Sequence, residues 1–225
     1  MKQAYIEGQD LYSLMASEIY GVPVDECKEF RADGTVNPEG KERRTSVKSI
    51  LLGIMYGRGT KSIAEQIGKS EAEAEKIVEN FFKGFPVIKE YQQGVIYKAE
   101  KLGYVSTLFG RKRRLPDMKC KRDSMEYQRA YRQTINSVIQ GTAGDLMKLA
   151  MINIYHHPRV RELGIHMIMT IHDELICEVP KEHVKEGVEL IASIMKDTGA
   201  NALGLPMKCD MEISSEWTGE GIELD

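Results

Sequence analysis

The sequence predicts an α+β protein, with a helical N-terminal half followed by a half that combines helices with antiparallel β-hairpins. Helix start and stop signals recur between residues 10 and 102. After Gly103 the pattern changes to short β-prone segments, and residues 165–179 form a run rich in Ile, Met and Val with a polar triplet in its middle. We find no internal repeat in the sequence, so these observations describe one non-repetitive α+β fold.

Composition excludes several classes of protein. A hydrophobic share of 42% and a charged share of 29% are typical of a globular chain. The longest apolar runs, such as residues 50–55, are too short to span a bilayer, and residues 1–9 lack the apolar stretch of a signal peptide. We therefore expect a cytoplasmic protein with no membrane partner. The four cysteines lie far apart, which argues against a zinc site or a disulfide framework.

The distribution of charge indicates a phosphate-binding surface more strongly than the net charge of −3 does. A basic cluster occupies residues 111–114 and is followed by Lys119, Lys121 and Arg122. Acidic residues gather instead between 212 and 225. The basic cluster fits contacts with nucleic-acid phosphates, and a solvated charged turn explains it equally well.

The first half contains five predicted helices. Asp10 caps a helix over residues 10–20, and a loop rich in Gly and Pro follows to residue 40. Further helices are predicted over residues 42–56, 60–67, 70–82 and 86–102. Ser70 with acidic residues in the first turn starts the fourth of these helices, and a proline starts the fifth.

The second half alternates β-hairpins and helices. A hairpin around Gly110 is predicted over residues 104–115, and a long helix over 124–156 contains Gly141 and Gly144. Residues 165–179 predict a strand, a tight turn and a second strand. A helix over 182–198 and a closing strand over 207–213 complete the order.

A regularly spaced stripe marks the helix at 42–56. Arg44, Lys48, Leu52 and Tyr56 recur every four residues and share one face over roughly 18 Å. The stripe begins cationic and ends apolar and aromatic, as a nucleoside triphosphate is anionic at one end and aromatic at the other. The alternative is an amphipathic helix with snorkelling basic side chains and a buried tyrosine.

The polar triplet His172-Asp173-Glu174 occupies the predicted turn between two apolar strands. Adjacent carboxylates at the tip of a mostly buried hairpin repel each other, and a divalent cation such as Mg²⁺ would offset that repulsion. An exposed acidic turn without a metal is the alternative.

Together these motifs resemble the A-family DNA polymerases of bacteria and phages. Residues 43–57 are similar to motif B of the fingers, and His172-Asp173-Glu174 to motif C of the palm. Between them, Arg132, Asn136 and Gln140, followed by Gly-Thr-Ala, resemble the palm helix that reads the primer–template minor groove. Residues 7–10 and 103–111 are also similar to family segments, in the family's order. The resemblance implies a partial right-hand polymerase, with a fingers-like helical subdomain over 1–123 and a palm-like α+β subdomain over 124–225.

The resemblance also implies roles and partners. Arg44, Lys48, Leu52, Tyr56 and Tyr12 would bind the incoming dNTP, and Lys48 would act in catalysis with Asp173 and Glu174. Asp173 would hold metal in a site that takes two Mg²⁺ ions when complete. The side chains implied to contact primer–template DNA are Arg132, Asn136, Gln140, His172 and Arg111.

The sequence departs from the family pattern at three points. Leu52 stands where the family usually has Phe or Tyr, and Tyr12 where many relatives have a phosphate-contacting His. No segment resembling motif A, which carries the second catalytic aspartate, occurs in the 225 residues. We therefore expect neither a thumb nor the motif A strand, little activity from the chain alone, and association with a polymerase segment that carries motif A. The alternative function is a non-catalytic DNA-binding or accessory remnant of such a polymerase.

Overall fold

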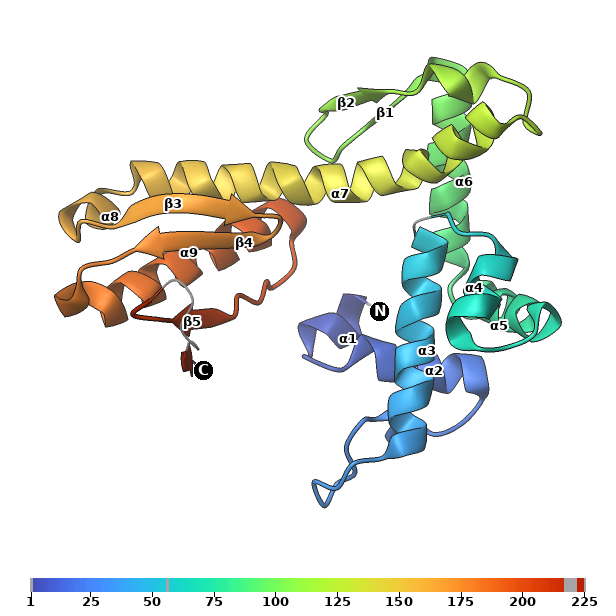
Figure 1. The fold of residues 1–225 in the computed structure, drawn as a ribbon, viewed down its shortest axis with the longest axis horizontal. Coiled ribbons are helices and arrows are strands. Elements are labelled where there is room, and N and C mark those ends of the chain that lie inside the picture. The colour runs from blue at the N-terminus through green and yellow to red at the C-terminus, as the bar shows by residue number, and fades with distance from the viewer. Residues whose placement is uncertain (1, 56, 217–221, 225) are drawn as a thin grey trace. The chain divides into compact units, whose positions relative to one another are not determined.

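The computed structural model describes residues 2–55, 57–216 and 222–224 (Figure 1). The chain divides into two compact units, residues 1–141 and 142–225. The first consists mainly of helices, and the second combines helices with antiparallel hairpins. The predicted α+β class is therefore confirmed.

The first unit begins with a group of helices and ends within a long helix that continues into the second unit. Its elements are α1 (Lys2–Ile6), α2 (Leu11–Tyr20), the 3-10 turn η1 (Val24–Cys27), α3 (Pro38–Met55), α4 (Thr60–Ile67), α5 (Glu71–Gly84), α6 (Pro86–Leu102), β1 (Tyr104–Ser106), β2 (Lys112–Arg114), η2 (Pro116–Lys119) and the first part of α7 (Met125–His156).

Local signals fix most of the helix ends. The Asp10 side chain accepts a hydrogen bond from the backbone of Tyr12 and caps α2. Ser70 and Glu73 form a reciprocal capping box at the start of α5. Gly68 and Gly103 end α4 and α6 in the left-handed conformation that glycine adopts most readily. These ends agree with the sequence prediction because each depends on neighbouring residues alone.

The start of α3 is a correction, because the helix begins at Pro38 and not at residue 42. Asn37 caps it, since its side-chain oxygen accepts from the Gly40 backbone at 3.3 Å. Proline suits the first helical turn because its missing N–H has no helical acceptor there. From the sequence, Gly40 is predicted to lie in a loop. In the structure it lies in α3, and a Cβ at this position would collide with the backbone carbonyl of Lys28. Glycine is present here because the segment before α3 packs against the helix.

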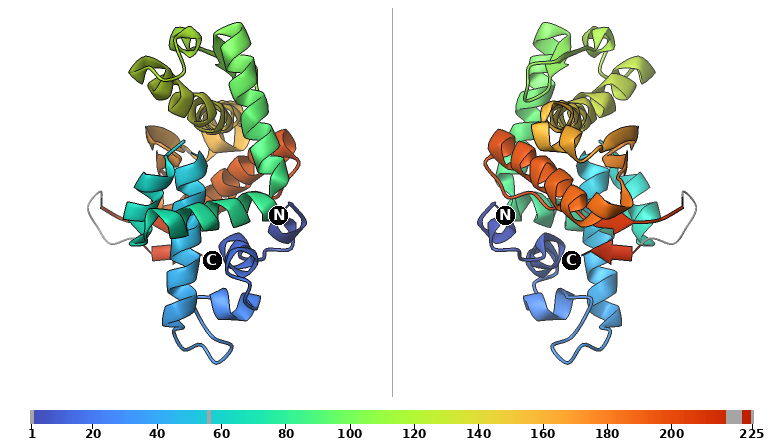
Figure 2. Two further views of the ribbon diagram at one scale, coloured as in Figure 1. Left: turned by 90° about the vertical axis from the view of Figure 1, so that its right-hand side faces the viewer. Right: turned by 90° about the vertical axis from the view of Figure 1, so that its left-hand side faces the viewer.

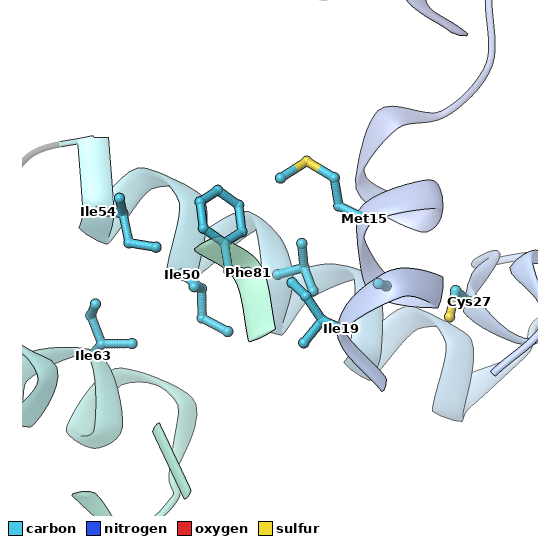
Figure 3. Packing of buried hydrophobic residues seen from close by; sticks show 9 residues of the cluster. Met15, Ile19, Cys27, Ile50, Ile54, Ile63 and Phe81 are labelled. Carbon is cyan, nitrogen blue, oxygen red and sulfur yellow. The ribbon is translucent and has the colours of Figure 1, made fainter. Parts of the chain in front are cut away.

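The core of the first helices draws one apolar side chain or more from each of α2 to α5. Figure 3 shows Met15 and Ile19 of α2, Ile50 of α3 and Phe81 of α5 turned toward one another, with Ile63 of α4 at the far side. Met15 and Phe81 are fully buried. This cluster holds α3 in place from its buried side and leaves the opposite side of that helix to solvent.

A second cluster joins α6 to the start of α7 through the β1–β2 hairpin. Val105 of β1, Leu115 and Met118 pack with Tyr127 and Ala130 of α7. Tyr104 and Arg114 are partners in the antiparallel register, which runs to Ser106 and Lys112. The predicted hairpin around Gly110 is confirmed, and its basic strand β2 lies on the exposed side.

The second unit packs a helix against a β-hairpin. Its elements are the rest of α7, α8 (Pro158–Glu162), β3 (His166–Ile171), β4 (Glu174–Glu178), η3 (Lys181–His183), α9 (Val184–Leu203), β5 (Met211–Ile213) and β6 (Ile222–Leu224). Figures 1 and 2 show α9 lying along one face of the β3–β4 hairpin. Ile154, Leu163 and Ile165 are buried in this layer, with Leu190 and Ile194 of α9 packed against them.

The β-strands of the second unit pair only as hairpins within the described residues. β3 pairs with β4, and β5 with β6, all antiparallel. The β3–β4 register shifts by one residue between Met167 and Met169, which is a β-bulge. Ile168, Met169 and Ile171 each keep more than 40% of their surface exposed. Among the described residues these apolar side chains of β3 are thus left largely uncovered.

The short elements α1, α8 and β6 and the 3-10 turns η1 and η2 were not predicted, because five residues or fewer carry little periodicity. The helix predicted over 182–198 begins at Val184 and extends to Leu203. The predicted closing strand is shorter and covers Met211–Ile213. Within the described ranges no helix is both long and apolar enough to cross a membrane.

Candidate functional site

The cationic end of the α3 stripe gathers around one tyrosine. Arg44 and Lys48 lie one turn apart, and both approach the ring of Tyr12 on α2. The Arg44 guanidinium carbon is 5.3 Å from the ring centroid, and the Lys48 Nζ is 5.9 Å from it. These distances suit cation–π attraction. The structure thus brings together three of the predicted dNTP-binding residues, from two helices.

Arg44 also forms an ion pair with Asp10. Its Nε donates to Oδ2 of Asp10 at 2.6 Å, and its Nη2 donates to Oδ1 at 3.4 Å. Burial raises the pKa of the Asp10 carboxyl, but hydrogen bonds from Arg44 and Ser13 and the charge of Arg44 outweigh it, so the pKa lies below its usual value. The hydrogen bond to Asp10 raises the pKa of Arg44.

Other basic residues of α3 are engaged with carboxylates nearby. Lys41 lies 2.7 Å from Glu29, and Arg43 lies 3.0 Å from Glu39. In the described part of the chain Lys48 has no carboxylate within ion-pair distance. Lys48 is also exposed, so its ammonium is available to an anion.

The apolar end of the stripe is described only in part. Leu52 is 38% exposed on the same side of α3 as Lys48. Tyr56, the last residue of the predicted stripe, lies outside the described residues. Gly57 follows with a φ of +67°, and a Cβ there would lie 3.0 Å from the Cα of Arg132 on α7. Gly57, in the segment that follows α3, therefore lies directly against the helix that carries the predicted DNA-binding residues.

Arg132, Asn136 and Gln140 share one side of α7 because they are spaced four residues apart. Arg132 and Gln140 are exposed, and Asn136 is half-buried. The Oδ1 atom of Asn136 is buried and has no hydrogen-bond partner in the described structure. Buried polar atoms without partners are rare in folded proteins and are often found at functional positions.

The β1–β2 hairpin is tied to α7 next to Gln140. The Nη2 atom of Arg111 donates to the backbone carbonyl of Gly141 at 2.9 Å. A Cβ on Gly141 would lie 2.7 Å from the Cγ2 of Thr107. The three basic residues of β2, Lys112, Arg113 and Arg114, are all exposed. Arg111 thus anchors the hairpin to α7, and residues 112–114 form an exposed basic surface.

The carboxylate turn of the second unit is tight and exposed. Ile171 pairs with Glu174, so His172 and Asp173 alone form the turn. His172 has a φ of +56° and is the only non-glycine residue with positive φ among those described. All three residues of the triplet are exposed, so the expectation of a buried tip with desolvated carboxylates is wrong for this chain.

The described residues contain no group of three or more His, Cys, Asp or Glu side chains that could hold a metal ion. The oxygen atoms of Asp173 and Glu174 nevertheless suit Mg²⁺, which takes few protein carboxylates and completes its shell with water and substrate oxygens. The donor set therefore fits one part of a magnesium site. The predicted nucleotide- and DNA-binding residues lie in the first unit, apart from His172, which lies with these carboxylates in the second.

Asp10 was missed as a site residue by the sequence analysis, which identified it only as a helix cap. Its position in the segment Glu7-Gly8-Gln9-Asp10 was a usable signal, because that segment belonged to the recognised motifs. Its distance of 34 residues from Arg44 hid the pairing. Only the packing of α2 on α3 brings the two side chains together.

Comparison with known proteins assigns the family. The family model described as "DNA polymerase family A" matches residues 1–219. The chain is 32% identical over 215 residues to the thermostable DNA polymerase I of Thermus aquaticus and 32% identical over 225 residues to the DNA polymerase I of Rhizobium leguminosarum. Each alignment covers 96% of this chain, but 24% of the first relative and 20% of the second. The chain thus spans about a quarter of the length of the curated relatives that it matches.

A solved structure agrees with this assignment. The polymerase domain of Pol1 from M. smegmatis, in complex with DNA primer–template and dNTP, superposes with a TM-score of 0.75 at 32% identity. The match covers 87% of this chain and 32% of that one. The partial fingers-and-palm architecture expected from the motifs is therefore confirmed. The chain belongs to DNA polymerase family A.

Proposed function

We propose that this chain is the fingers-and-palm portion of a template-directed DNA polymerase, which transfers a nucleotidyl group from a dNTP to a primer 3′-hydroxyl. The observation that carries the proposal is the meeting of Tyr12, Arg44 and Lys48 on the exposed side of α3. The solved relative with 32% identity was captured with DNA primer–template and dNTP, which supports the same two partners here.

In this proposal Arg44 and Lys48 bind the triphosphate of the incoming nucleotide. Guanidinium and ammonium groups form strong charge-assisted bonds to phosphate oxygens, and they stabilise the charge that develops on the leaving pyrophosphate. Lys48 is the main catalytic cation. In the described structure no carboxylate forms an ion pair with its ammonium group, so this charge is available to the triphosphate. Tyr12 supports both cations, and the family resemblance assigns Leu52 and Tyr56 to the sugar and base of the nucleotide.

The duplex is held by α7 and the β1–β2 hairpin. Asn136 and Gln140 offer amide groups to minor-groove acceptors, where the pattern is nearly independent of sequence. The orphaned Oδ1 of Asn136 supports this role, because bound DNA or its hydration would supply the missing partner. Arg132 and the basic residues 112–114 contact phosphates, Arg111 holds the hairpin beside them, and His172 contacts the primer terminus.

Asp173 would hold the divalent metal, with Glu174 as the adjacent carboxylate. A complete site of this class has two Mg²⁺ ions, which activate the attacking hydroxyl and neutralise the leaving oxygens. Within this chain Asp173 supplies one ligand, and its exposed position at the hairpin turn leaves room for a second aspartate from another segment. Asp173 and Glu174 would hold the cation that this site takes.

We further propose that a polymerase segment carrying motif A completes the site, either joined to this sequence or as a separate polypeptide. The uncovered side of the β3–β4 hairpin supports this, because Ile168, Met169 and Ile171 are exposed and the strand edges are unpaired among the described residues. An added strand would satisfy those edges and bury the apolar side chains. Without that segment we expect little or no activity.

Primer extension with Mg²⁺ and dNTPs tests this function. The chain alone is compared with the chain mixed with a polymerase segment that carries motif A, and Asp173→Ala and Lys48→Ala are tested in the mixture. Asp123→Ala serves as a control, since Asp123 is an exposed aspartate with no assigned role in binding metal or nucleotide. We expect activity only in the mixture, lost with Asp173→Ala and Lys48→Ala and retained with Asp123→Ala.

Two other outcomes decide against parts of the proposal. Extension by the chain alone would show that a carboxylate within these 225 residues replaces the motif A aspartate. No extension from a mixture whose parts demonstrably associate, with salt-dependent DNA binding retained, would favour a non-catalytic DNA-binding remnant.

A further inference from the structure

The ion pair between Arg44 and Asp10 uses only one edge of the guanidinium group. Nε and Nη2 face the carboxylate, at 2.6 and 3.4 Å. A guanidinium carries five N–H donors, and the edge formed by Nη1 and Nη2 offers a second place for bidentate contact, here with a phosphate. Asp10 and a phosphate group can therefore bind Arg44 simultaneously, on different edges.

Asp10 is itself held rigidly. Its Oδ1 accepts from the Tyr12 backbone N–H at 3.2 Å, and its Oδ2 accepts from the Ser13 hydroxyl at 2.7 Å. Ser13 is fully buried, and its hydroxyl also lies 2.9 Å from the carbonyl of Cys27. The carboxylate thus has a position set by the first turn of α2. Through the ion pair, the carboxylate also fixes the position of the Arg44 side chain on α3.

The ring of Tyr12 adds a second constraint. It lies within 6 Å of both cationic groups of α3, at 5.3 Å from Arg44 and 5.9 Å from Lys48. Tyr12 follows Asp10 by two residues, so one short segment contacts both cations. The start of α2 therefore orients the two side chains that the proposed function assigns to the triphosphate.

We propose that Asp10 is a positioning residue for nucleotide binding, which fixes Arg44 so that its outer edge meets the triphosphate. This inference rests on the proposed function, because it assumes that Arg44 and Lys48 bind triphosphate. Arginine has a long side chain with large rotamer entropy, and a side chain held in place before binding loses less of that entropy when the ligand arrives. Asp10 supplies that preorganisation.

The sign of the effect separates positioning from simple competition. Removing a carboxylate makes the site more positive, and by charge alone this strengthens binding of an anion. Loss of orientation weakens binding. A carboxylate that only competed with phosphate for Arg44 would therefore give tighter binding when removed, whereas a positioning carboxylate gives weaker binding.

The test measures binding of inorganic tripolyphosphate and of dATP to the full chain by calorimetry, without metal. Asp10→Ser is the informative variant, because serine keeps a good helix cap but is too short to reach Arg44. Asp10→Asn keeps an oxygen that can accept from the Arg44 Nε–H, but its amide nitrogen then replaces the Oδ1 that caps α2. Glu29→Gln is the matched control. It removes the carboxylate that lies 2.7 Å from Lys41, and Lys41 is on α3, the helix that carries Arg44.

We expect Asp10→Ser to weaken tripolyphosphate binding roughly fivefold, which is within the usual cost of ordering one side chain on binding. Asp10→Asn should bind close to wild type, and Glu29→Gln should not weaken binding. Nuclear magnetic resonance of the Arg44 Nε–Hε group supplies a readout independent of affinity. Its slow hydrogen exchange in the wild type should be lost in Asp10→Ser and largely kept in Asp10→Asn.

Lys48→Ala separates this proposal from the proposed function. If wild type binds tripolyphosphate, Lys48→Ala does not, and Asp10→Ser binds as tightly as wild type or more tightly, the positioning role is overturned while the nucleotide site stands. If wild type and Lys48→Ala both fail to bind, the nucleotide site is overturned and the positioning role with it.

Discussion

The guanidinium of Arg111 lies 2.9 Å from the backbone carbonyl of Gly141, joining the β1–β2 hairpin to the middle of α7. The approach is close because position 141 has no side chain. Glycine in the interior of a helix costs about 0.5–1 kcal/mol relative to alanine, so its presence calls for a reason. Here the reason is the methyl group of Thr107, which occupies the space that a Cβ would need.

Alanine substitutions at the two glycines of α7 should therefore have opposite effects. Gly144 has open space where a Cβ would be, so Gly144→Ala should stabilise the chain by about 0.5–1 kcal/mol. Gly141→Ala should destabilise it by ~1 kcal/mol, because overpacking against Thr107 outweighs the gain in helix propensity. Urea denaturation of both variants measures the difference. Equal stabilisation by both would show that the hairpin does not pack tightly on α7.

Gly57 provides a comparable test at the end of α3. Gly57 and Gly68 have nearly the same φ, +67° and +66°, but only Gly57 faces a neighbour, the backbone of Arg132. Alanine at either position pays the left-handed penalty of about 1–2 kcal/mol. Gly57→Ala should lower the free energy of unfolding by ~1 kcal/mol more than Gly68→Ala, because its Cβ also displaces α7. Equal losses would contradict the close contact between Gly57 and α7.

The backbone conformation of His172 in the turn is expected to lower the stability of the chain. Its positive φ costs an L-residue about 1–2 kcal/mol, and glycine would relieve this at a smaller entropic cost. His172→Gly should therefore stabilise the chain by ~0.5 kcal/mol in thermal or urea unfolding. His166→Gly is the control, since His166 lies in β3 opposite Glu178 and should destabilise when replaced. A loss of stability in His172→Gly would show that the side chain itself holds the turn.

The cysteines should react with iodoacetamide at very different rates. Cys120 is exposed, whereas Cys27 is fully buried. Burial raises the pKa of Cys177 to about 11, so at pH 8 only about one molecule in a thousand carries the reactive thiolate there. Mass spectrometry at pH 8 should find Cys120 alkylated first and Cys27 and Cys177 much later. Labelling of Cys177 should rise with pH up to about 11. In the unfolded chain the cysteines should react at similar rates.

The sequence alone determined the family, most of the helices and the chemistry of the motifs. The helices over residues 60–67 and 86–102 agree with the structure at both ends, because a capping residue, a proline or a glycine marks each boundary locally. The order of motifs along the chain was sufficient for the family because it is a property of sequence. Residue types at fixed spacing likewise identified Arg44 and Lys48 as a cationic pair.

Only the tertiary structure decided which groups meet across long separations. Three contacts join segments that are distant in sequence. They are the ion pair of Asp10 with Arg44, the close approach of Gly40 to the Lys28 carbonyl and the contact of Gly57 with Arg132. It also decided that the His172–Glu174 turn is exposed, because burial depends on what covers a hairpin and not on its own residues. Helix ends depend on backbone groups within one turn, whereas contacts between elements depend on how whole faces pack.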